Sequence, residues 1–371
     1  MHVVVVGAGV IGAAVAEALS VGGAEVTVLD MRSPGRGASQ ASAGVLAPYT
    51  EAHGNTPLLD LCARSLDMFD TFIAGVRERS GRAIEYARTG TLEVALSAAE
   101  AEHLLNAKAW LDTTGVQSEW LTPDAIRARE SAVSPAAVGA LFIPTHGFIQ
   151  VPALVTALVQ SARVSGAVFE SPVEAVDVQP RTAGVDVRAG ARTYRADHVV
   201  ISAGSWSRRV RVQGMPALPV RPIRGQLLHL QWTNGAPPAR VVWGSECYTV
   251  PWTDGTLLVG ATVEDVGFDE TSTVAGVQAL SAAVAALLPD ARNATVREIR
   301  VGLRPATGDG LPIIGPVRSA PNVTIATGHY RNGILLAPLT ASLVRRYVLD
   351  GETDPAFGVT SPDRFRAQPS A

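Results

Sequence analysis

The chain has 371 residues, more than one ordinary core holds, so we expect two domains or one elaborated domain. Hydrophobic residues make up 47% of it and charged residues 18%, a composition that excludes a disordered polypeptide. The formal net charge of −3 and the lack of a basic tract argue against nucleic acid as a partner.

The first turn of the chain carries a nucleotide-binding pattern. The unbroken apolar run Val3–Val6 predicts a strand that is buried on both faces. Gly7, Gly9 and Gly12 follow with the spacing G-x-G-x-x-G. The first glycine permits a tight turn, the second lets a pyrophosphate approach the backbone, and the third lets the next helix, Ala13–Ser20, pack closely. A glycine triplet by itself also fits an ordinary strand–turn–helix corner.

The second strand gives this pattern its context. Residues Glu25–Asp30 read as a strand that ends in an acid about 20 residues on, where a carboxylate accepts a hydrogen bond from a ribose hydroxyl. We therefore predict dinucleotide binding, and which dinucleotide is bound stays open at this point. The small, polar stretch Ser33–Gly44 is either a flexible loop or backbone that runs along the cofactor.

The rest of the chain alternates between helical and strand patterns. Apolar spacing and capping residues predict helices at 58–80, 98–113, 151–165, 274–288 and 333–349. A further helix is predicted to begin at Pro123, directly after the N-cap Thr122. Strands are predicted at 91–96, 140–147, 192–204, 226–232, 247–252, 256–262 and 322–327, with Asp254-Gly255 as a hairpin signal.

These patterns predict an α/β protein with two domains. The buried run His198–Gly204 belongs with the opening strand in a sheet that is covered on both faces, whereas 225–260 reads as an antiparallel sheet. We therefore expect the chain to begin in a nucleotide-binding domain and to pass into a second α+β domain. It then returns to the first domain, enters the second again and ends in the first.

The cysteines and the N-terminus bear on location. Cys62 and Cys247 are the only cysteines, which is too few for a disulfide framework or a metal knuckle, so we expect a reducing cytoplasm and no metal site. The N-terminus lacks the basic region of a signal peptide, and its apolar run is too short for a bilayer. We expect a soluble, cytoplasmic protein without a membrane partner. The sequence leaves its oligomeric state, a homo-oligomer included, undecided.

Three later stretches bear on function. Residues 193–204 look like a second flavoprotein signature, although any buried strand shares that pattern. The stretch 301–315 places Arg304 among glycines and prolines, and the stretch 326–338 joins the last strand to the last helix. With the first 46 residues and 247–251, these stretches resemble the FAD-dependent oxidases of the D-amino-acid oxidase family, and within it the bacterial glycine oxidases. The resemblance runs nearly end to end. Its most specific motif, Gly328–Pro338, is absent from NAD dehydrogenases.

The resemblance implies a fold. We expect a Rossmann-type FAD-binding domain of the glutathione-reductase kind from residues 1–85, 148–215 and 300–371. A substrate-binding domain built on an antiparallel sheet is expected from residues 86–147 and 216–299.

The resemblance also implies a substrate site. An amino-acid carboxylate needs a planar, permanently charged partner, and arginine supplies a bidentate fork. That partner is implied to be Arg304, with the Tyr248 hydroxyl as a second donor and Arg331 as a further substrate-binding and catalytic residue. The alternatives are an ion pair for Arg304, a packed sheet aromatic for Tyr248 and a loop-orienting salt bridge for Arg331. Glu246, where bacterial glycine oxidases can carry a histidine, alters the charge at the pocket mouth and leaves the substrate range open.

The implied cofactor is FAD. It should be bound non-covalently, since neither cysteine lies where the neighbouring sarcosine oxidases attach it, and Lys108 is in no matching motif. His329 is expected to be a structural donor and not a base. The implied FAD-contacting residues are Gly7, Gly9, Val10, Ile11, Gly12, Asp30, Met31, Ala38, Ser39, Ala43, Gly44, Val45, Val173, Ala203, Gly204, Gly328, His329, Tyr330, Arg331, Asn332, Gly333, Ile334 and Leu335.

The implied activity is oxidation of glycine, sarcosine, D-alanine or similar small amines to an oxo-acid, ammonia and hydrogen peroxide, with O2 as acceptor. No protein base is needed if the amine binds in its neutral form. One alternative is a dehydrogenase that oxidises D-amino or 2-hydroxy acids and reduces a quinone, and the other is a non-catalytic flavin-binding subunit. Thiamine biosynthesis is a usual pathway of the glycine oxidases, but no residue here encodes it.

Overall fold

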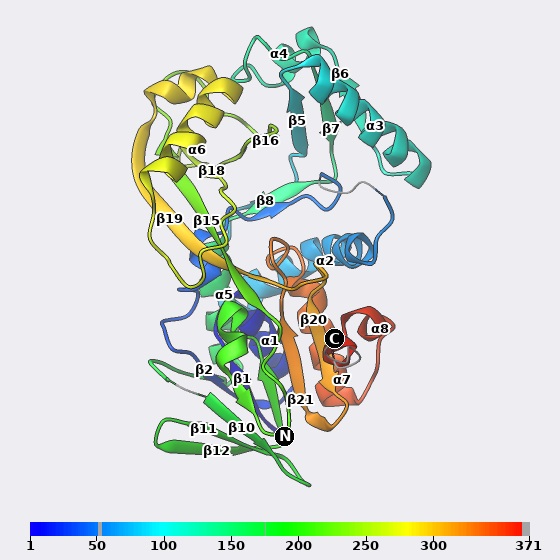
Figure 1. The fold of residues 1–371 in the computed structure, drawn as a ribbon, viewed down its shortest axis with the longest axis vertical. Helices are drawn as coiled ribbons and strands as arrows, with labels where there is room; N and C mark the ends of the chain where they lie inside the picture. Colours follow the sequence, from blue (N-terminus) through cyan, green and yellow to red (C-terminus); the bar gives the residue numbers. More distant parts are fainter. Residues whose placement is uncertain (51–53, 175, 366–371) are drawn as a thin grey trace.

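A six-stranded sheet lies in the lower half of the molecule in Figure 1. The computed structural model describes residues 1–50, 54–174 and 176–365. The strand order is β20-β21-β13-β1-β2-β9, and β1 pairs in parallel with both β2 and β13. The strands are β1 (His2–Val6), β2 (Glu25–Leu29), β9 (Val168–Glu170), β13 (His198–Ile201), β20 (Ile313–Val317) and β21 (Ala320–Thr327).

The four valines of β1 are buried because this sheet is covered on both faces. Val3 and Val5 pack in one core with the long helices, whereas Val4 and Val6 pack in another core with a smaller sheet. The helices are α1 (Val10–Val21), α2 (Pro57–Ser80), α5 (Val151–Val164) and α7 (Ala337–Asp350), and the smaller sheet contains β10 (Val176–Pro180), β11 (Val185–Ala189), β12 (Arg192–Ala196) and β14 (Arg211–Val212). The prediction of a doubly covered parallel strand is confirmed.

The second sheet has eight strands in the order β19-β15-β18-β17-β16-β5-β7-β6. Its described pairings are antiparallel except that β16 runs parallel to β5. The strands are β5 (Thr91–Ala95), β6 (Glu119–Leu121), β7 (Gly139–Ile143), β15 (Arg221–Gln231), β16 (Val241–Trp243), β17 (Tyr248–Pro251), β18 (Thr256–Gly260) and β19 (Thr295–Ala306). Beside it lie α3 (Ala98–Thr114), α4 (Pro123–Arg129) and α6 (Val274–Leu287) (Figure 1).

Short elements join these layers. A three-stranded sheet has the order β3-β8-β4. These and the other short elements are β3 (Val45–Leu46), β4 (Tyr86–Ala87), β8 (Gly147–Ile149), α8 (Ala356–Thr360) and the 3₁₀ turns η1 (Ala38–Ala41), η2 (Gly204–Arg209), η3 (Pro289–Asn293) and η4 (Pro362–Phe365). None of the helices in the described part of the chain is long and apolar enough to cross a membrane.

Several predicted elements differ in their bounds. The stretch 192–204 contains two strands in different sheets, β12 and β13, and 140–147 splits between β7 and β8. The last helix begins at Ala337 and not at Gly333, because residues 333–336 form a turn. The hairpin at Asp254-Gly255 is confirmed: it joins β17 to β18, with Gly255 at φ +78°.

The long strands β15 and β19 connect the two halves. They pair antiparallel from Arg221 opposite Ala306 to Gln231 opposite Thr295, with one irregularity near His229. β19 therefore crosses the expected domain boundary at residue 300. Its last residues lie against η1 and η2, which belong to the six-stranded half. This strand carries Arg304 to the place where the two halves meet.

Candidate active site

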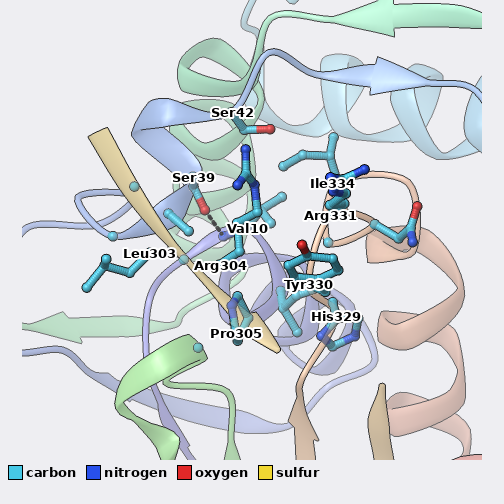
Figure 2. Close-up of a pocket in the computed structure, with 18 of the residues that line it drawn as sticks. Val10, Ser39, Ser42, Leu303, Arg304, Pro305, His329, Tyr330, Arg331 and Ile334 are labelled. Atoms are coloured by element: carbon cyan, nitrogen blue, oxygen red, sulfur yellow. Dashed lines mark hydrogen bonds between the residues drawn. The ribbon is translucent and has the colours of Figure 1, made fainter. Parts of the chain in front are cut away.

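A cavity of about 800 Å³ lies where the β1–α1 turn, η1, β19 and the loop after β21 meet. That volume is in the upper part of the range of small-molecule sites, about 300–1,000 Å³. Figure 2 shows Arg304 and Pro305 on β19 at one side of the cavity, and Tyr330 and Arg331 on the opposite loop. The predicted cofactor and substrate residues are thus brought to one place from both ends of the chain.

All the predicted site residues line this cavity except two, Gly12 and Gly328. A Cβ at Gly12 would lie 1.8 Å from the Gly7 carbonyl oxygen, so this glycine allows α1 to pack against the turn. Gly328 has φ +76°, and a Cβ there would lie 2.7 Å from Thr307 Cγ2. Both glycines shape the wall from behind and do not line the cavity themselves.

Two glycines of the cavity wall stand where a side chain has no room. Gly7 has φ +106°, and a Cβ there would lie 2.5 Å from the Ser202 carbonyl oxygen. Gly44 has φ +78°, and its Cβ would lie 1.8 Å from the Ile149 carbonyl oxygen. Both glycines line the cavity and allow its wall to pack directly against the neighbouring main chain at Ser202 and Ile149.

The stretch 33–44 runs along the cavity and contains the turn η1. Ser39 Oγ accepts a hydrogen bond of 3.0 Å from the Val10 N–H, which holds η1 against the start of α1 (Figure 2). Of the two interpretations of this stretch, the structure favours backbone along a cofactor.

Asp30 is held at the end of β2 by backbone donors. Its two oxygens accept from the Ala8 N–H at 2.6 Å and from the Arg32 N–H at 2.7 Å. Burial raises the pKa of Asp30, and these two donors oppose that shift. Each oxygen keeps a second lone pair, so a hydroxyl group in the cavity could still be bound.

Sequence reasoning missed the polar and aromatic residues beside Asp30. The Arg32 guanidinium pairs with Glu270 at 2.6 Å and lies 4.7 Å from the Trp206 ring centroid. Trp206 in turn contacts Phe268, with ring centroids 5.7 Å apart. Arg32 and Trp206 line the cavity. Their partners come from a distant part of the chain, so no local pattern linked them.

Arg304 lies half-buried over the start of β15. Its Nη1 donates to the Thr262 carbonyl at 2.9 Å and to the Arg224 carbonyl at 3.4 Å. Gly225 leaves room for the guanidinium, because a Cβ there would lie 2.3 Å from Nη2. These two bonds to main-chain carbonyls orient the guanidinium.

Tyr248 lies on β17, at the same wall of the cavity. Its ring stacks on Trp243, with centroids 4.7 Å apart and an interplanar angle of 29°. A Cβ at Gly260, the residue opposite on β18, would lie 2.6 Å from the Tyr248 hydroxyl oxygen. Tyr248 is therefore both a packed sheet aromatic and a residue of the cavity wall.

Glu246 is exposed in the turn between β16 and β17, which the Gly244 N–H closes by donating to the Cys247 carbonyl at 2.8 Å. Burial, and then the charge of Glu246, raise the pKa of Cys247 to about 12. Cys247 is therefore a thiol and not a thiolate at neutral pH.

The loop after β21 has a constrained backbone. Tyr330 adopts φ +49°, which is uncommon for a residue with a side chain, and its N–H donates to the Pro305 carbonyl at 2.9 Å. Arg331 is exposed, with its guanidinium carbon 5.4 Å from the Tyr330 ring centroid. The loop is thereby tied to β19, next to Arg304.

His329 is buried in the same loop. Its Nε2 forms a 3.0 Å hydrogen bond with Thr340 Oγ1 on α7. Burial lowers the pKa of His329 to about 3. The imidazole is therefore neutral at pH 7.

Known proteins share this sequence and architecture. The bifunctional protein ThiO/ThiG of Nostoc sp. is 33% identical over 374 residues, which cover 99% of this chain but only 56% of that protein. The chain thus spans little more than half the length of this bifunctional relative. Glycine oxidase of Geobacillus kaustophilus is 32% identical over 352 residues, 95% of this chain and 93% of that protein. Its crystal structure matches with a TM-score of 0.92 over 98% of both chains.

Residues 2–346 match the DAO family, described as FAD dependent oxidoreductase. This match covers most of the chain and includes both the glycine turn and the loop after β21. The family, the fold and the cofactor implied by the resemblance are confirmed: the chain belongs to the DAO family of FAD-dependent oxidoreductases.

Proposed function

We propose that the protein oxidises glycine and small amines of its kind. The reaction would consume one molecule each of glycine, O2 and water and give glyoxylate, ammonia and hydrogen peroxide. The observation that carries the proposal is the position of Arg304, which lines the same cavity as Gly7, Gly9 and Asp30. Similarity to glycine oxidases over nearly the full chain supports the same assignment.

The residues that line the cavity suit FAD in their chemistry. The glycines of the β1–α1 turn would take the pyrophosphate, Asp30 a ribose hydroxyl, and the loop 328–335 the flavin end. Bound FAD would supply the acceptor for the hydride of the substrate α-carbon and pass the electrons to O2. Both cysteines line the cavity, but burial raises the pKa of Cys62 and Cys247 to about 12, which disfavours the thiolate that a covalent link would need at neutral pH. We therefore propose non-covalent binding.

Arg304 would bind the substrate carboxylate. A guanidinium can form two parallel hydrogen bonds to a carboxylate, which fixes the orientation of the α-carbon. The Tyr248 hydroxyl would add a neutral donor from the adjacent strand, and Arg331 a second positive charge from the facing loop. Glu246, at the mouth, would disfavour substrates that carry a second negative charge near it.

The chain's contribution is orientation and not proton abstraction. His329 lines the cavity, but its lowered pKa makes it a poor base, and its Nε2 is occupied by Thr340. The substrate amine would therefore bind neutral, after it has lost its proton to water. The carboxylate contacts would hold the amine while its α-carbon loses a hydride. The resulting imine would then react with water to give the oxo-acid and ammonia.

We also propose how the chain divides these tasks. Residues 1–85, 148–215 and 300–371 would hold the cofactor, and 86–147 and 216–299 would shape the substrate side. Cys62 and Cys247 are free and buried, which supports a reducing compartment, and we propose the cytoplasm.

The test is a substrate panel on the FAD-loaded protein. Glycine, sarcosine, D-alanine and D-proline are each mixed with the protein while oxygen uptake and peroxide are recorded. Peroxide in equal amount to the oxygen consumed, with glycine or sarcosine as a substrate, is the expected result. Reduction of an artificial dye without oxygen uptake would instead indicate a dehydrogenase. A flavin that no amino acid bleaches under anaerobic conditions would contradict the proposal.

A further inference from the structure

One buried arginine anchors the segment 262–273, which links β18 to α6. The Arg224 side chain is 4% exposed, and its guanidinium donates to Glu264 Oε2 at 2.5 Å, to Asp269 Oδ2 at 2.6 Å and to the Thr271 carbonyl at 3.0 Å. A buried guanidinium requires such partners, because an unpaired charge in the interior is costly. The two carboxylates share Arg224, but they differ in what else they contact.

Glu264 uses its other oxygen on the residues next to the cavity. Its Oε1 accepts from Thr262 Oγ1 at 2.5 Å and from Gln226 Nε2 at 2.7 Å. Thr262 Oγ1 in turn accepts from the Gln226 N–H at 2.9 Å. The main chains of Glu264 and Arg224 also pair with each other, at 2.8 and 3.0 Å. Both the side chain and the backbone of Glu264 therefore fix the positions of Thr262 and Arg224.

The Arg304 guanidinium is bonded to these same two residues. Its Nη1 donates to the carbonyls of Thr262 and Arg224, at 2.9 and 3.4 Å. We propose that Glu264 is a positioning residue for the substrate carboxylate, because it fixes the two carbonyls that set the direction of Arg304. This inference rests on the proposed function, in which Arg304 binds that carboxylate.

The ionised form of Glu264 is the one that the network requires. Burial by itself would raise the pKa of Glu264, but the donors Thr262, Arg224 and Gln226 together lower it. A carboxylate accepts hydrogen bonds only, so it forces the Thr262 hydroxyl to point its hydrogen at Glu264 and its lone pair at the Gln226 N–H. A neutral amide at position 264 cannot impose that pattern on all three donors.

The test compares matched variants by carboxylate binding and by kinetics. Acetate, a carboxylate without an amine, is titrated into the FAD-loaded protein, and its Kd is read from the flavin absorbance and from the rise in melting temperature. Glu264→Gln is the main variant. Asp269→Asn is its control, because Asp269 also accepts from Arg224 but has no bond to Thr262. Thr262→Val and Thr262→Ser form a second pair, in which only serine keeps the hydroxyl.

Glu264→Gln and Thr262→Val should each raise the acetate Kd and the glycine KM about tenfold, with little change in kcat, since a charge-linked hydrogen-bond pattern is lost. Thr262→Ser should restore most of the affinity, and Asp269→Asn should bind acetate like the wild type. An unchanged Kd in Glu264→Gln, or an equal loss in Asp269→Asn, would overturn the inference. If Glu264→Gln does not fold, equal affinities of Thr262→Val and Thr262→Ser would overturn it.

The two proposals fail differently. A wild-type protein that neither binds acetate nor oxidises glycine would overturn the proposed function, and the role of Glu264 with it. A wild type that does both, beside variants with unchanged affinity, would overturn the role of Glu264 alone.

Discussion

Replacement of Arg304 is the most direct test of the substrate site. Loss of one partner of a desolvated charge pair costs about 2–5 kcal/mol, or about 30- to 5,000-fold in affinity. Arg304 is only half-buried, and its Nη1 already donates to the Thr262 carbonyl, so part of the guanidinium is not available to substrate. We therefore expect the lower part of the range, about 30- to 150-fold in the glycine KM for Arg304→Ala.

Arg304→Lys separates charge from geometry. Lysine keeps the positive charge but lacks the planar fork, so we expect a smaller rise in KM, about tenfold. Initial rates of peroxide formation are measured over a range of glycine concentrations, and the flavin absorbance of each purified variant gives its FAD content. Both variants should keep FAD, because the nucleotide turn and Asp30 are untouched. An unchanged KM in a fully FAD-loaded Arg304→Ala would refute the assignment of the carboxylate partner.

Three further predictions follow from the packing. In Gly225→Ala, the new Cβ would lie 2.3 Å from Arg304 Nη2, so the guanidinium must move, and the glycine KM should rise while FAD content stays normal. In Gly44→Ala, the Cβ would lie 1.8 Å from the Ile149 carbonyl oxygen, at a φ of +78°; FAD content and melting temperature should both fall, and normal values of both would contradict the close approach. The pKa of His329 is about 3 in the folded protein, against 6.5 as its ordinary value, so below pH 6.5 the unfolded chain binds a proton that the folded chain does not. The free energy of unfolding should therefore fall with decreasing pH, by up to about 1.4 kcal/mol per pH unit from this residue, and a His329→Gln variant with the same pH dependence between pH 7 and 5 would show that His329 is not the cause.

The sequence predicted those elements whose cause is local. Val3–Val6 is apolar on both faces of its strand, and the glycines that follow have a fixed spacing, so strand, turn and helix could be read from a few neighbouring residues. The strands β10 and β11 were missed. Both are short and alternate apolar with polar residues, and the core that they cover belongs to a sheet formed by other parts of the chain.

The sequence predicted the residues of the candidate site but not the contacts and the strand that hold them in place. Arg304 was identified from a resemblance, whereas the carbonyls of Thr262 and Arg224 that hold it are main-chain atoms, 42 and 80 residues away in sequence. The strand β19 that carries it was not predicted, because its first half is an exposed sheet edge with charged residues and no alternating apolar face. Arg32 and Glu270, 238 residues apart, meet only because the two halves of the molecule are packed together.

The order of strands in the first sheet has a consequence for how the protein is made. β1 lies between β2 and β13, and β21 and the loop that closes the cavity come from residues 320–335. During translation the valines of β1 leave the ribosome about 200 residues before β13. Since synthesis proceeds from the N-terminus at roughly 5–20 residues per second, β13 emerges well after β1. For that interval the edge of β1 that later pairs with β13 has no partner strand, although β2 and α1 have already emerged. The cavity is complete only after the residues that follow β21 emerge, so we expect cofactor loading to be among the last events in the biogenesis of this protein.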